Sequence, residues 1–198
     1  MKYVIIALAA YLLGSFCASI PLSKKLYGAD VRNYGSGNAG ATNVARVYGL
    51  KAGLLTLACD MAKTVAAVLL GKYIGGTAGE ALAGTACIIG HCFPVYFGLR
   101  GGKGVSVGAA LGLVCGWKVF LAVMAVFFVF AGCSKKVSLG SICAAAALPL
   151  LAWAFSVPEP MLWMCIFSAV LVVFMHRENI GRLLKGTEGD FRPKTDRK

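Results

Sequence analysis

Apolar segments of membrane-crossing length alternate with short polar segments along most of this chain. A helix needs about 20 predominantly apolar residues to cross the hydrocarbon core of a bilayer. Five segments follow this pattern, and they cover residues 3–22, 49–70, 81–97, 137–155 and 161–175. We expect each of them to be helical, so the pattern predicts an all-α integral membrane protein, a polytopic helical bundle.

A sixth apolar segment, residues 105–132, is interrupted near its middle by Gly116, Trp117 and Lys118. One long tilted helix would bury Lys118, which costs about 3 kcal/mol on insertion scales. Two helices of about 12 to 14 residues avoid that cost, but each is short for a hydrocarbon core about 30 Å thick and requires a thinned bilayer or a re-entrant hairpin. The apolar pattern alone leaves both arrangements open.

The positions of the positive charges favour the two-helix arrangement. Lys and Arg accumulate in the cytoplasmic loops of membrane proteins. The positive side chains that flank the predicted helices here are Lys24, Lys25, Arg32, Arg46, Arg100, Lys103, Lys135, Lys136 and those from Arg177 onward. They share one side only if residues 105–132 hold two helices. We therefore predict about seven transmembrane or partly spanning helices, with the N-terminus outside and the C-terminus cytoplasmic. The outer links would be residues 71–80, the turn at Lys118 and residues 156–160.

Composition agrees with a membrane protein and narrows the partners. Hydrophobic residues make up 59% of the chain, the mean hydropathy is +0.76, and the net charge is +12. The basic residues are separated by apolar segments, so anionic lipid, membrane orientation and an acidic substrate explain them better than nucleic acid does. The first apolar segment lacks a convincing cleavage site, and we expect it to be retained. We expect one domain over residues 1–188 and a basic, disordered tail over residues 189–198.

Eight cysteines are scattered singly, without a C-x-x-C pair and without histidines at zinc-ligand spacing. They are Cys17, Cys59, Cys87, Cys92, Cys115, Cys133, Cys143 and Cys165. Free cysteines in apolar segments pack as small hydrophobic residues. The pattern therefore predicts neither a disulfide framework nor a metal site, and nothing in it calls for a cofactor.

A glycine-rich basic loop lies between two apolar segments. It contains Gly101, Gly102, Lys103 and Gly104. Glycines free backbone N–H groups to converge on an anion, and lysine adds positive charge, so the loop is typical of a phosphate cradle. The alternative is a polar turn that joins two transmembrane helices, and for such a loop in isolation that alternative would be preferred.

A second polar cluster follows the first apolar segment, at residues 35–46. Its hydrogen-bonding side chains are Ser36, Asn38, Thr42, Asn43 and Arg46. The planar guanidinium of arginine matches phosphate, and a helix that starts near Asn38 or Ala41 would add positive potential. Helix capping and close glycine packing would account for Ser36 and Gly40 but not for the other side chains. We favour a substrate-binding role.

A third polar cluster begins where the last apolar segment ends, at residues 176–188. Helical spacing places His176 and Asn179 on one face, and Arg182 follows three residues later. These imidazole, amide and guanidinium groups can project into one pocket at the membrane edge. The alternative is a basic helix whose side chains reach anionic lipid, which would explain Arg177, Arg182 and Lys185.

Together the three clusters resemble the bacterial acyl-phosphate:glycerol-3-phosphate acyltransferases, the PlsY family, over nearly the whole chain. That family's patterns G-S-G-N-x-G-A-T-N-x-x-R, G-H-x-F-P-V-(F/Y)-x-x-(F/L)-(K/R)-G-G-K-G-V and H-R-x-N-I-x-R-L-L-x-G-x-E occur here in the same order, from Gly35, Gly90 and His176. Asp60 and Lys63 match its D-x-x-K. A direct role for this pair and an ion pair that lowers the cost of membrane insertion are equally acceptable at this stage.

The resemblance implies transfer of a fatty acyl group from acyl phosphate to the sn-1 hydroxyl of glycerol 3-phosphate, at the cytoplasmic side of a bacterial plasma membrane. It assigns the reaction pocket to Ser36, Arg46, Lys103, Ser141, His176 and Asn179. It assigns the shape of the phosphate loop to Gly101, Gly102 and Gly104, and further substrate contacts to Asn38, Thr42, Asn43, Arg182 and Glu188. It implies that Lys103 and Ser36 hold the acyl phosphate, while Arg46, His176 and Asn179 hold glycerol 3-phosphate.

Neither histidine begins the H-x-x-x-x-D pattern of other glycerolipid acyltransferases. An acyl phosphate is already activated, so positioning and charge stabilisation would supply most of the rate. We expect no acyl-enzyme, and either His176 or a substrate phosphate oxygen takes the hydroxyl proton. Expected partners are acyl phosphate, glycerol 3-phosphate, membrane lipids and, transiently, the enzyme that makes the acyl phosphate.

Three other functions remain to be compared with this one. A transporter of a phosphorylated solute would use the intramembrane Asp60 and Lys63, but such proteins bind substrate near the midplane between repeated halves, and no repeat is visible. An acyl-CoA or acyl carrier protein donor would keep the acceptor and change the leaving group. A structural lipid-binding scaffold would not need three polar clusters.

Overall fold

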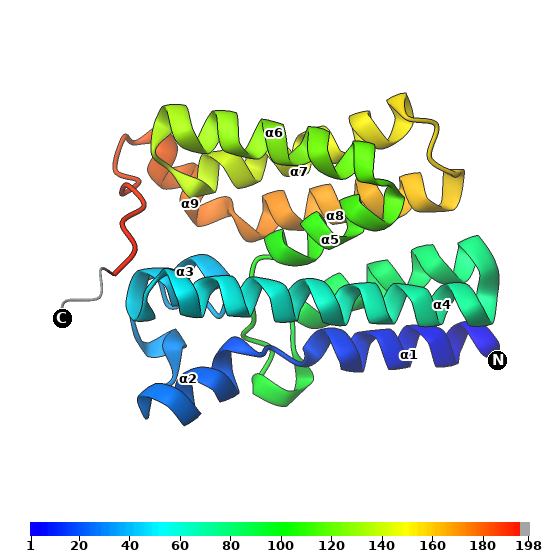
Figure 1. Ribbon diagram of the computed structural model, residues 1–198, viewed down its shortest axis with the longest axis horizontal. Helices are drawn as coiled ribbons and strands as arrows, with labels where there is room; N and C mark the ends of the chain where they lie inside the picture. The colour runs from blue at the N-terminus through cyan, green and yellow to red at the C-terminus, as the bar shows by residue number, and fades with distance from the viewer. Residues whose placement is uncertain (195–198) are drawn as a thin grey trace.

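The computed structural model describes residues 1–194, and within that part of the chain it consists of helices joined by loops, without strands. The helices run in the order α1 (Lys2–Ser15), α2 (Ser19–Tyr27), α3 (Ala41–Tyr48), α4 (Leu50–Cys92), α5 (Val105–Cys115), α6 (Trp117–Ser134), α7 (Val137–Ala154), α8 (Glu159–Met175) and α9 (Arg177–Leu184), with short 3-10 turns η1 (Val31–Asn33) and η2 (Val95–Phe97). Figure 1 shows α1 and α4 side by side, with α5 between them and the layer of α6, α7 and α8.

The first predicted helix, residues 3–22, is wrong in its extent. The structure divides it into α1, which ends at Ser15, and α2, which begins at Ser19. The Lys63 ammonium donates hydrogen bonds to the carbonyl oxygens of Gly14 (3.0 Å) and Phe16 (2.8 Å). A helix ends more easily where its last carbonyls find other partners, and here the partner is 47 residues away in sequence. Hydropathy alone does not contain this information.

Helix α4 is a hairpin of two helical arms. Only Gly76 leaves the helical conformation inside it, with φ 62° and ψ −153°. Figure 1 shows α4 turning back near the N-terminus of the chain. The two apolar segments predicted on either side are thus confirmed as separate helices, but the link between them, residues 71–80, is helical except at this glycine. That backbone conformation is open to glycine and almost closed to other residues.

The prediction of two helices within residues 105–132 is confirmed. Helix α5 has 11 residues and α6 has 18, and Gly116 between them has φ 140° and ψ 148°. At about 1.5 Å per residue, α5 is about half as long as a hydrocarbon core is thick, so it crosses only part of a membrane. Lys118 lies exposed in the first turn of α6 and is not buried in a long helix.

Length and apolar composition identify four helical stretches able to cross a membrane, and α8 with α9, bent by 58°, adds a fifth. One of the four is α4 with η2, which reverses at Gly76 and therefore supplies two crossings. With the partly spanning α5, the described chain agrees with the predicted bundle of about seven helical segments. Figure 1 places the N-terminus and the C-terminal segment at opposite ends of the bundle.

Small residues bring the helices close together. A Cβ atom on Gly14 of α1 would lie 2.2 Å from the Cys87 carbonyl oxygen of α4, and one on Gly90 of α4 would lie 2.2 Å from the Tyr11 carbonyl oxygen. Helices in membranes associate through such close backbone contacts, because lipid offers no hydrophobic driving force between them. Helix α1 is thereby fixed against the second arm of α4, which leads directly into the glycine-rich loop.

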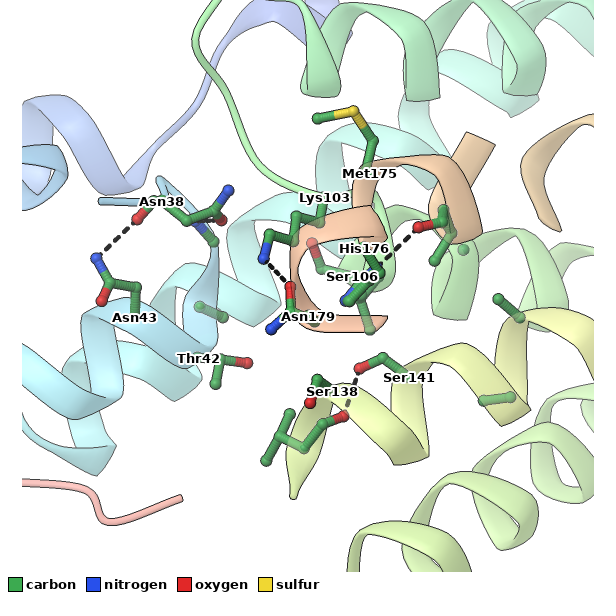
Figure 2. Close-up of a pocket in the computed structure, with 18 of the residues that line it drawn as sticks. Asn38, Thr42, Asn43, Lys103, Ser106, Ser138, Ser141, Met175, His176 and Asn179 are labelled. Carbon is green, nitrogen blue, oxygen red and sulfur yellow. Dashed lines mark hydrogen bonds between the residues drawn. The ribbon is translucent and has the colours of Figure 1, made fainter. Parts of the chain in front are cut away.

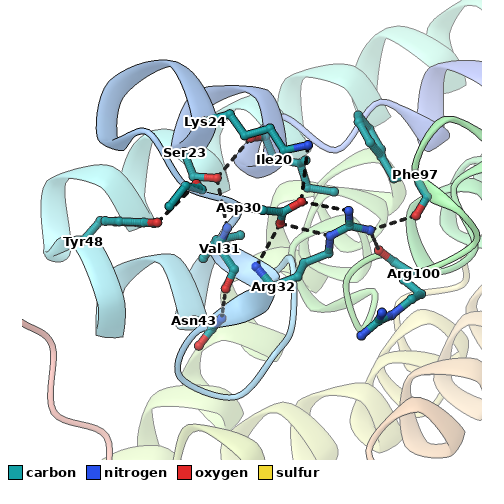
Figure 3. A network of polar contacts seen from close by, with 11 residues as sticks. Ile20, Ser23, Lys24, Asp30, Val31, Arg32, Asn43, Tyr48, Phe97 and Arg100 are labelled. Atoms are coloured by element: carbon teal, nitrogen blue, oxygen red, sulfur yellow. Dashed lines mark hydrogen bonds and ion pairs between the residues drawn. The ribbon is translucent and has the colours of Figure 1, made fainter.

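A polar network fixes the segment between α2 and α3 to the start of that loop (Figure 3). The Arg32 guanidinium donates two hydrogen bonds to the Asp30 carboxylate, at 3.1 and 2.9 Å. Its third nitrogen donates to the carbonyl oxygens of Phe97 (2.8 Å) and Arg100 (3.1 Å). Arg32 therefore ties the chain before α3 to the residue that immediately precedes Gly101.

Candidate active site

A cavity of about 790 Å³ opens at the end of the bundle that holds α3, α9 and the C-terminal segment. One part of its wall is polar and the other is apolar. The polar part includes Ser36, Arg46, Lys103, His176, Asn179 and Arg182. The apolar part, from α4, α5, α6 and α7, includes Leu57, Ala109, Met124, Phe127 and Leu148. A ligand with an anionic head and an apolar chain matches this division.

The three predicted clusters meet at this cavity (Figure 2). Of the predicted site residues, the structure places eleven in its wall: Ser36, Asn38, Thr42, Asn43, Arg46, Lys103, Ser141, His176, Asn179, Arg182 and Glu188. The three loop glycines, Gly101, Gly102 and Gly104, do not line it. The clusters are far apart in sequence, so their meeting is a property of the tertiary structure.

The first cluster forms a loop that ends in helix α3. Asn43 is only 2% exposed and organises this loop: its amide donates to the carbonyl oxygens of Val31, Tyr34 and Asn38, and its oxygen accepts from the Ser36 backbone N–H at 2.8 Å. Its hydrogen-bonding capacity is thus used within the protein. Asn43 shapes the site, and this differs from the substrate contact that the sequence predicts.

Three other side chains of this cluster face the cavity with their polar groups open. Within residues 1–194, the side chains of Ser36, Thr42 and Arg46 make no hydrogen bond or ion pair. Asn38 is intermediate, since its amide donates to the Gly101 carbonyl oxygen at 3.3 Å and its oxygen accepts from the Gly40 N–H at 2.8 Å. The open side chains are the ones that a polar ligand would find without breaking an existing contact.

The glycine-rich loop differs from the predicted phosphate cradle in one respect. The Gly101 N–H donates to the Cys92 carbonyl oxygen (3.2 Å), and the Gly102 N–H donates to the His91 carbonyl oxygen (3.0 Å). Both N–H groups are occupied, so they do not converge on an anion. The glycines serve close packing instead, because a Cβ on either residue would lie 2.0 Å from an atom of His91.

Lys103 is the residue of this loop whose charged side chain enters the cavity. Its ammonium donates a hydrogen bond to the Asn179 side-chain oxygen (Figure 2). Burial lowers the pKa of Lys103, and the positive charge of Arg182 lowers it further. A ligand anion beside Lys103 would favour the charged ammonium and raise its pKa again. The loop therefore presents one cation to the cavity and holds it with the amide of the third cluster.

The third cluster begins where α8 bends into α9. His176 is 4% exposed, and its Nδ1 lies 2.8 Å from the Val172 carbonyl oxygen. A carbonyl only accepts hydrogen bonds, so Nδ1 carries the hydrogen. Burial lowers the pKa of His176, which keeps the ring neutral near pH 7. In that state Nε2 carries a lone pair and can accept a proton.

Glu188 connects helices α7 and α9 at the mouth of the cavity. It accepts hydrogen bonds from Ser138 (2.6 Å), from Asn179 (2.7 Å) and from Arg182 (2.6 Å). Burial raises the pKa of Glu188, but these three hydrogen bonds outweigh it and lower the pKa overall. Glu188 thus orients Asn179 and Arg182. Ser138 was missed from the sequence, although its position one turn before Ser141 was a usable signal.

The first residues of the tail predicted over residues 189–198 lie at the mouth of the cavity. Gly189, Asp190 and Phe191 line the cavity. The Phe191 N–H donates to the Lys135 carbonyl oxygen at 2.9 Å, and the Lys194 N–H donates to the Ala45 carbonyl oxygen at 3.2 Å. Residues 189–194 thereby connect α3 with the α6–α7 link. Residues 195–198 of the tail lie outside the described residues, and disorder of the tail stays a prediction.

Comparison with known proteins gives one consistent family. The family model described as glycerol-3-phosphate acyltransferase matches residues 4–186. A glycerol-3-phosphate acyltransferase of Syntrophotalea carbinolica is 40% identical over 193 residues, which covers 96% of this chain and 98% of the relative. The corresponding protein of Thermoanaerobacter pseudethanolicus is 40% identical over 196 residues and covers 99% of both chains.

Two solved structures have the same fold. One is the integral membrane glycerol 3-phosphate acyltransferase PlsY (YgiH) in its glycerol 3-phosphate form, with a TM-score of 0.91 and 36% identity over 97% of this chain and 96% of that one. The other is its lysophosphatidic acid form, with a TM-score of 0.89, 33% identity and the same coverage.

Proposed function

This chain belongs to the glycerol-3-phosphate acyltransferase family, and we propose that it transfers a fatty acyl group from an acyl phosphate to the sn-1 hydroxyl of glycerol 3-phosphate. The products are lysophosphatidic acid and inorganic phosphate. The observation that carries the proposal is the divided cavity, in which Arg46, Lys103 and Arg182 lie at one end and an apolar groove lies at the other. Two phosphate-bearing substrates need several cations, and an acyl chain needs apolar walls.

Acyl phosphate is the donor that best fits the chemistry of the cavity. His176 hydrogen-bonds through Nδ1 to the Val172 carbonyl and not to a carboxylate, so it is a base of ordinary strength or weaker. Thioester donors place a bulky nucleotide or protein at the leaving group, whereas phosphate is small and anionic. An activated donor held between cations requires little more than positioning and charge stabilisation.

The proposed reaction is a single displacement without an acyl-enzyme. The glycerol hydroxyl oxygen attacks the acyl carbonyl carbon, an ester C–O bond forms, and the C–O bond to phosphate breaks. The hydroxyl proton passes to His176 Nε2 or to an oxygen of the departing phosphate. Lys103 and Ser36 hold the donor phosphate, and Arg46 with His176 holds glycerol 3-phosphate. Asn179 contributes by orienting Lys103, to which it is hydrogen-bonded.

We also propose that the cavity opens to the cytoplasm across a bacterial plasma membrane. Helix α2 with Lys24, the α6–α7 link with Lys135 and helix α9 with Arg177 lie at the cavity end, while the start of α6 with Lys118 lies at the other end. The excess of positive charge marks the cytoplasmic side. On that side the enzyme that produces acyl phosphate could deliver its product directly, and glycerol 3-phosphate would arrive from solution.

The test is phosphate release by the purified protein in detergent with lipid. With palmitoyl phosphate we expect release that depends on glycerol 3-phosphate, and with palmitoyl-CoA we expect no product. Lys103→Ala should remove turnover and leave the melting temperature unchanged, while Lys118→Ala, the same change at the opposite end, should leave turnover unchanged. Activity with the CoA ester alone would overturn the donor, and substantial activity of Lys103→Ala would overturn the role of Lys103.

A further inference from the structure

A second charged cluster lies behind the glycine-rich loop, buried between α1, α4 and α5. Asp60 is 1% exposed and forms an ion pair with Lys63 at 2.9 Å. His91, also 1% exposed, has its Nδ1 3.1 Å from the Lys63 ammonium and 3.6 Å from the Asp60 carboxylate. The second carboxylate oxygen of Asp60 accepts a hydrogen bond from the Ser106 hydroxyl at 3.0 Å. Four side chains from three separate sequence segments thus form one network.

This network holds the glycine-rich loop at both of its ends. Before the loop, the His91 carbonyl accepts from the Gly102 N–H, and the His91 ring packs so closely on Gly102 that a Cβ there would lie 2.0 Å from Nε2. After the loop, Ser106 stands in the first turn of α5 and is bound to Asp60. Lys103 lies between these two fixed points, one residue from Gly102 and three from Ser106.

The packing on Gly102 restricts access to His91, although this residue contributes to the cavity wall. The His91 ring is 1% exposed, its Nδ1 lies near Lys63 and Asp60, and its Nε2 lies against Gly102 on the side that carries no Cβ. The groups nearest to the ring nitrogens therefore belong to the protein. His91 and Asp60 resemble a catalytic pair in composition, but their contacts connect them to the glycine-rich loop.

An ion pair kept only to ease membrane insertion would have no reason to touch the loop. Buried charges cost several kcal/mol each, and well-packed apolar residues often replace such pairs without loss of stability. Where buried pairs are retained, fixing one arrangement of their neighbours is a use with a physical rationale. The neighbours of this pair are the end of α1, where Lys63 donates to two carbonyl oxygens, and the two ends of the loop that carries Lys103.

We propose that Asp60, Lys63 and His91 are positioning residues, which act through Gly102 and Ser106 to hold the Lys103 ammonium where it contacts the phosphate of the donor. The proposal rests on the proposed function, in which Lys103 binds the acyl phosphate. A displacement of about 1 Å in a reacting centre can cost a hundredfold in rate. The network therefore matters first for the donor substrate, because the proposed glycerol 3-phosphate contacts, Arg46 on α3 and His176 at the bend between α8 and α9, make no hydrogen bond or ion pair with it within residues 1–194.

The test is a charge-free pair, Asp60→Asn with Lys63→Met, assayed for both substrates. We expect the KM for palmitoyl phosphate to rise about tenfold or more and kcat to fall, with the KM for glycerol 3-phosphate within about twofold of the original. A pair that only eases insertion predicts unchanged kinetics in this variant. Unchanged donor KM and kcat would therefore overturn the proposal.

The matched control is the other lysine–carboxylate pair of the same helix. Lys72 lies 3.2 Å from Glu80, which is 4% exposed, at the hairpin end of α4 away from the cavity. Lys72→Met with Glu80→Gln should leave both KM values unchanged. A rise in donor KM in this control as well would show a general effect of charge removal and would overturn the specific role of Asp60 and Lys63.

A milder variant keeps the test decisive if the charge-free pair does not fold. Ser106→Ala removes one hydroxyl and its hydrogen bond to Asp60, and we expect a several-fold rise in donor KM at an unchanged melting temperature; an unchanged donor KM would overturn the proposal. Restoring the hydroxyl with Ser106→Thr should recover the donor KM. The unmodified protein is assayed first: absence of any glycerol 3-phosphate-dependent release there would overturn the proposed function itself.

Discussion

Arg32 and Arg46 stand near each other in sequence and belong to the same end of the molecule, but the structure uses them in opposite ways. Each guanidinium nitrogen of Arg32 donates to a protein oxygen, of Asp30, Phe97 or Arg100 (Figure 3). Arg46 lines the cavity and makes no hydrogen bond or ion pair within residues 1–194. A guanidinium whose donors are all engaged belongs to the fold, whereas one left open is suited to a ligand anion.

The variant with the largest expected effect is Arg46→Ala, which tests whether Arg46 serves ligand binding and not the fold. We expect catalytic efficiency to fall by about a hundredfold to a thousandfold, because two charge-assisted hydrogen bonds to phosphate are worth roughly 3 to 4 kcal/mol together. The melting temperature should not change, since no protein contact is lost. Arg46→Lys should recover part of the activity, because it keeps the charge but not the planar fork. Lower stability with normal activity would reverse the roles of the two arginines.

A second measurement tests whether His176 Nε2, like the Arg46 guanidinium, is free to interact with a substrate. Because burial lowers the pKa of His176 below its usual value of 6.5, more than half of the rings are still neutral at pH 6.5. We expect the acid limb of kcat/KM to have its midpoint below pH 6.5 and to fall about tenfold per pH unit below the lowered pKa. The pH profile of kcat/KM for His176→Gln is the control, because it reports the ionisation of the substrates alone. A midpoint at or above pH 6.5 for His176 in the original protein would contradict the expectation.

A third measurement examines the arginine of the fold. Arg32→Ala leaves two backbone carbonyls without their partner and leaves the Asp30 carboxylate with only Lys24, at 3.5 Å, and the backbone N–H of residue 32, so we expect about 1 to 3 kcal/mol of destabilisation. For a chain of 198 residues this is a melting temperature lower by roughly 2 to 12 °C. Activity at low temperature should fall only a few-fold. If the melting temperature is unchanged in lipid and in detergent, the network does not stabilise the fold.

The smallest effect is the pH dependence of that same network. Hydrogen bonds from Arg32 lower the pKa of Asp30 from 3.8 to about 2. A carboxyl whose pKa is lower in the folded state stabilises the fold above the unfolded pKa and loses that contribution as pH falls through the folded value. We expect the difference in melting temperature between the original protein and Arg32→Ala to stay constant down to about pH 4. It should shrink between about pH 4 and pH 2, and a constant difference throughout would contradict this assignment.

Apolar periodicity predicted the later helices well. The segments expected at 137–155 and 161–175 are α7 (Val137–Ala154) and α8 (Glu159–Met175). Positive charge predicted the two helices that became α5 and α6. The break after Ser15 was not predictable in this way, because it depends on Lys63, which is distant in sequence and close only after α1 packs on α4.

The site divides in the same manner. Motif spacing identified the polar side chains of the cavity but expected both Asn43 and Ser36 to contact substrate, although Asn43 is saturated by protein groups and the Ser36 side chain faces the cavity. It also assigned the amides of Gly101 and Gly102 to an anion, when both are bound to backbone. Partners that are decided by packing cannot be inferred from the type of a residue.

The sequence by itself determined that this protein is a helical membrane protein, because membrane insertion selects for runs of apolar residues and places charge between them. It also determined the family, through three motifs in a fixed order. The tertiary structure alone decided which charged groups are occupied: Arg32 and Asp60 within the fold, Arg46 at the cavity. The reason is physical, since a hydrogen bond depends on distances of about 3 Å between atoms that the chain brings together only on folding.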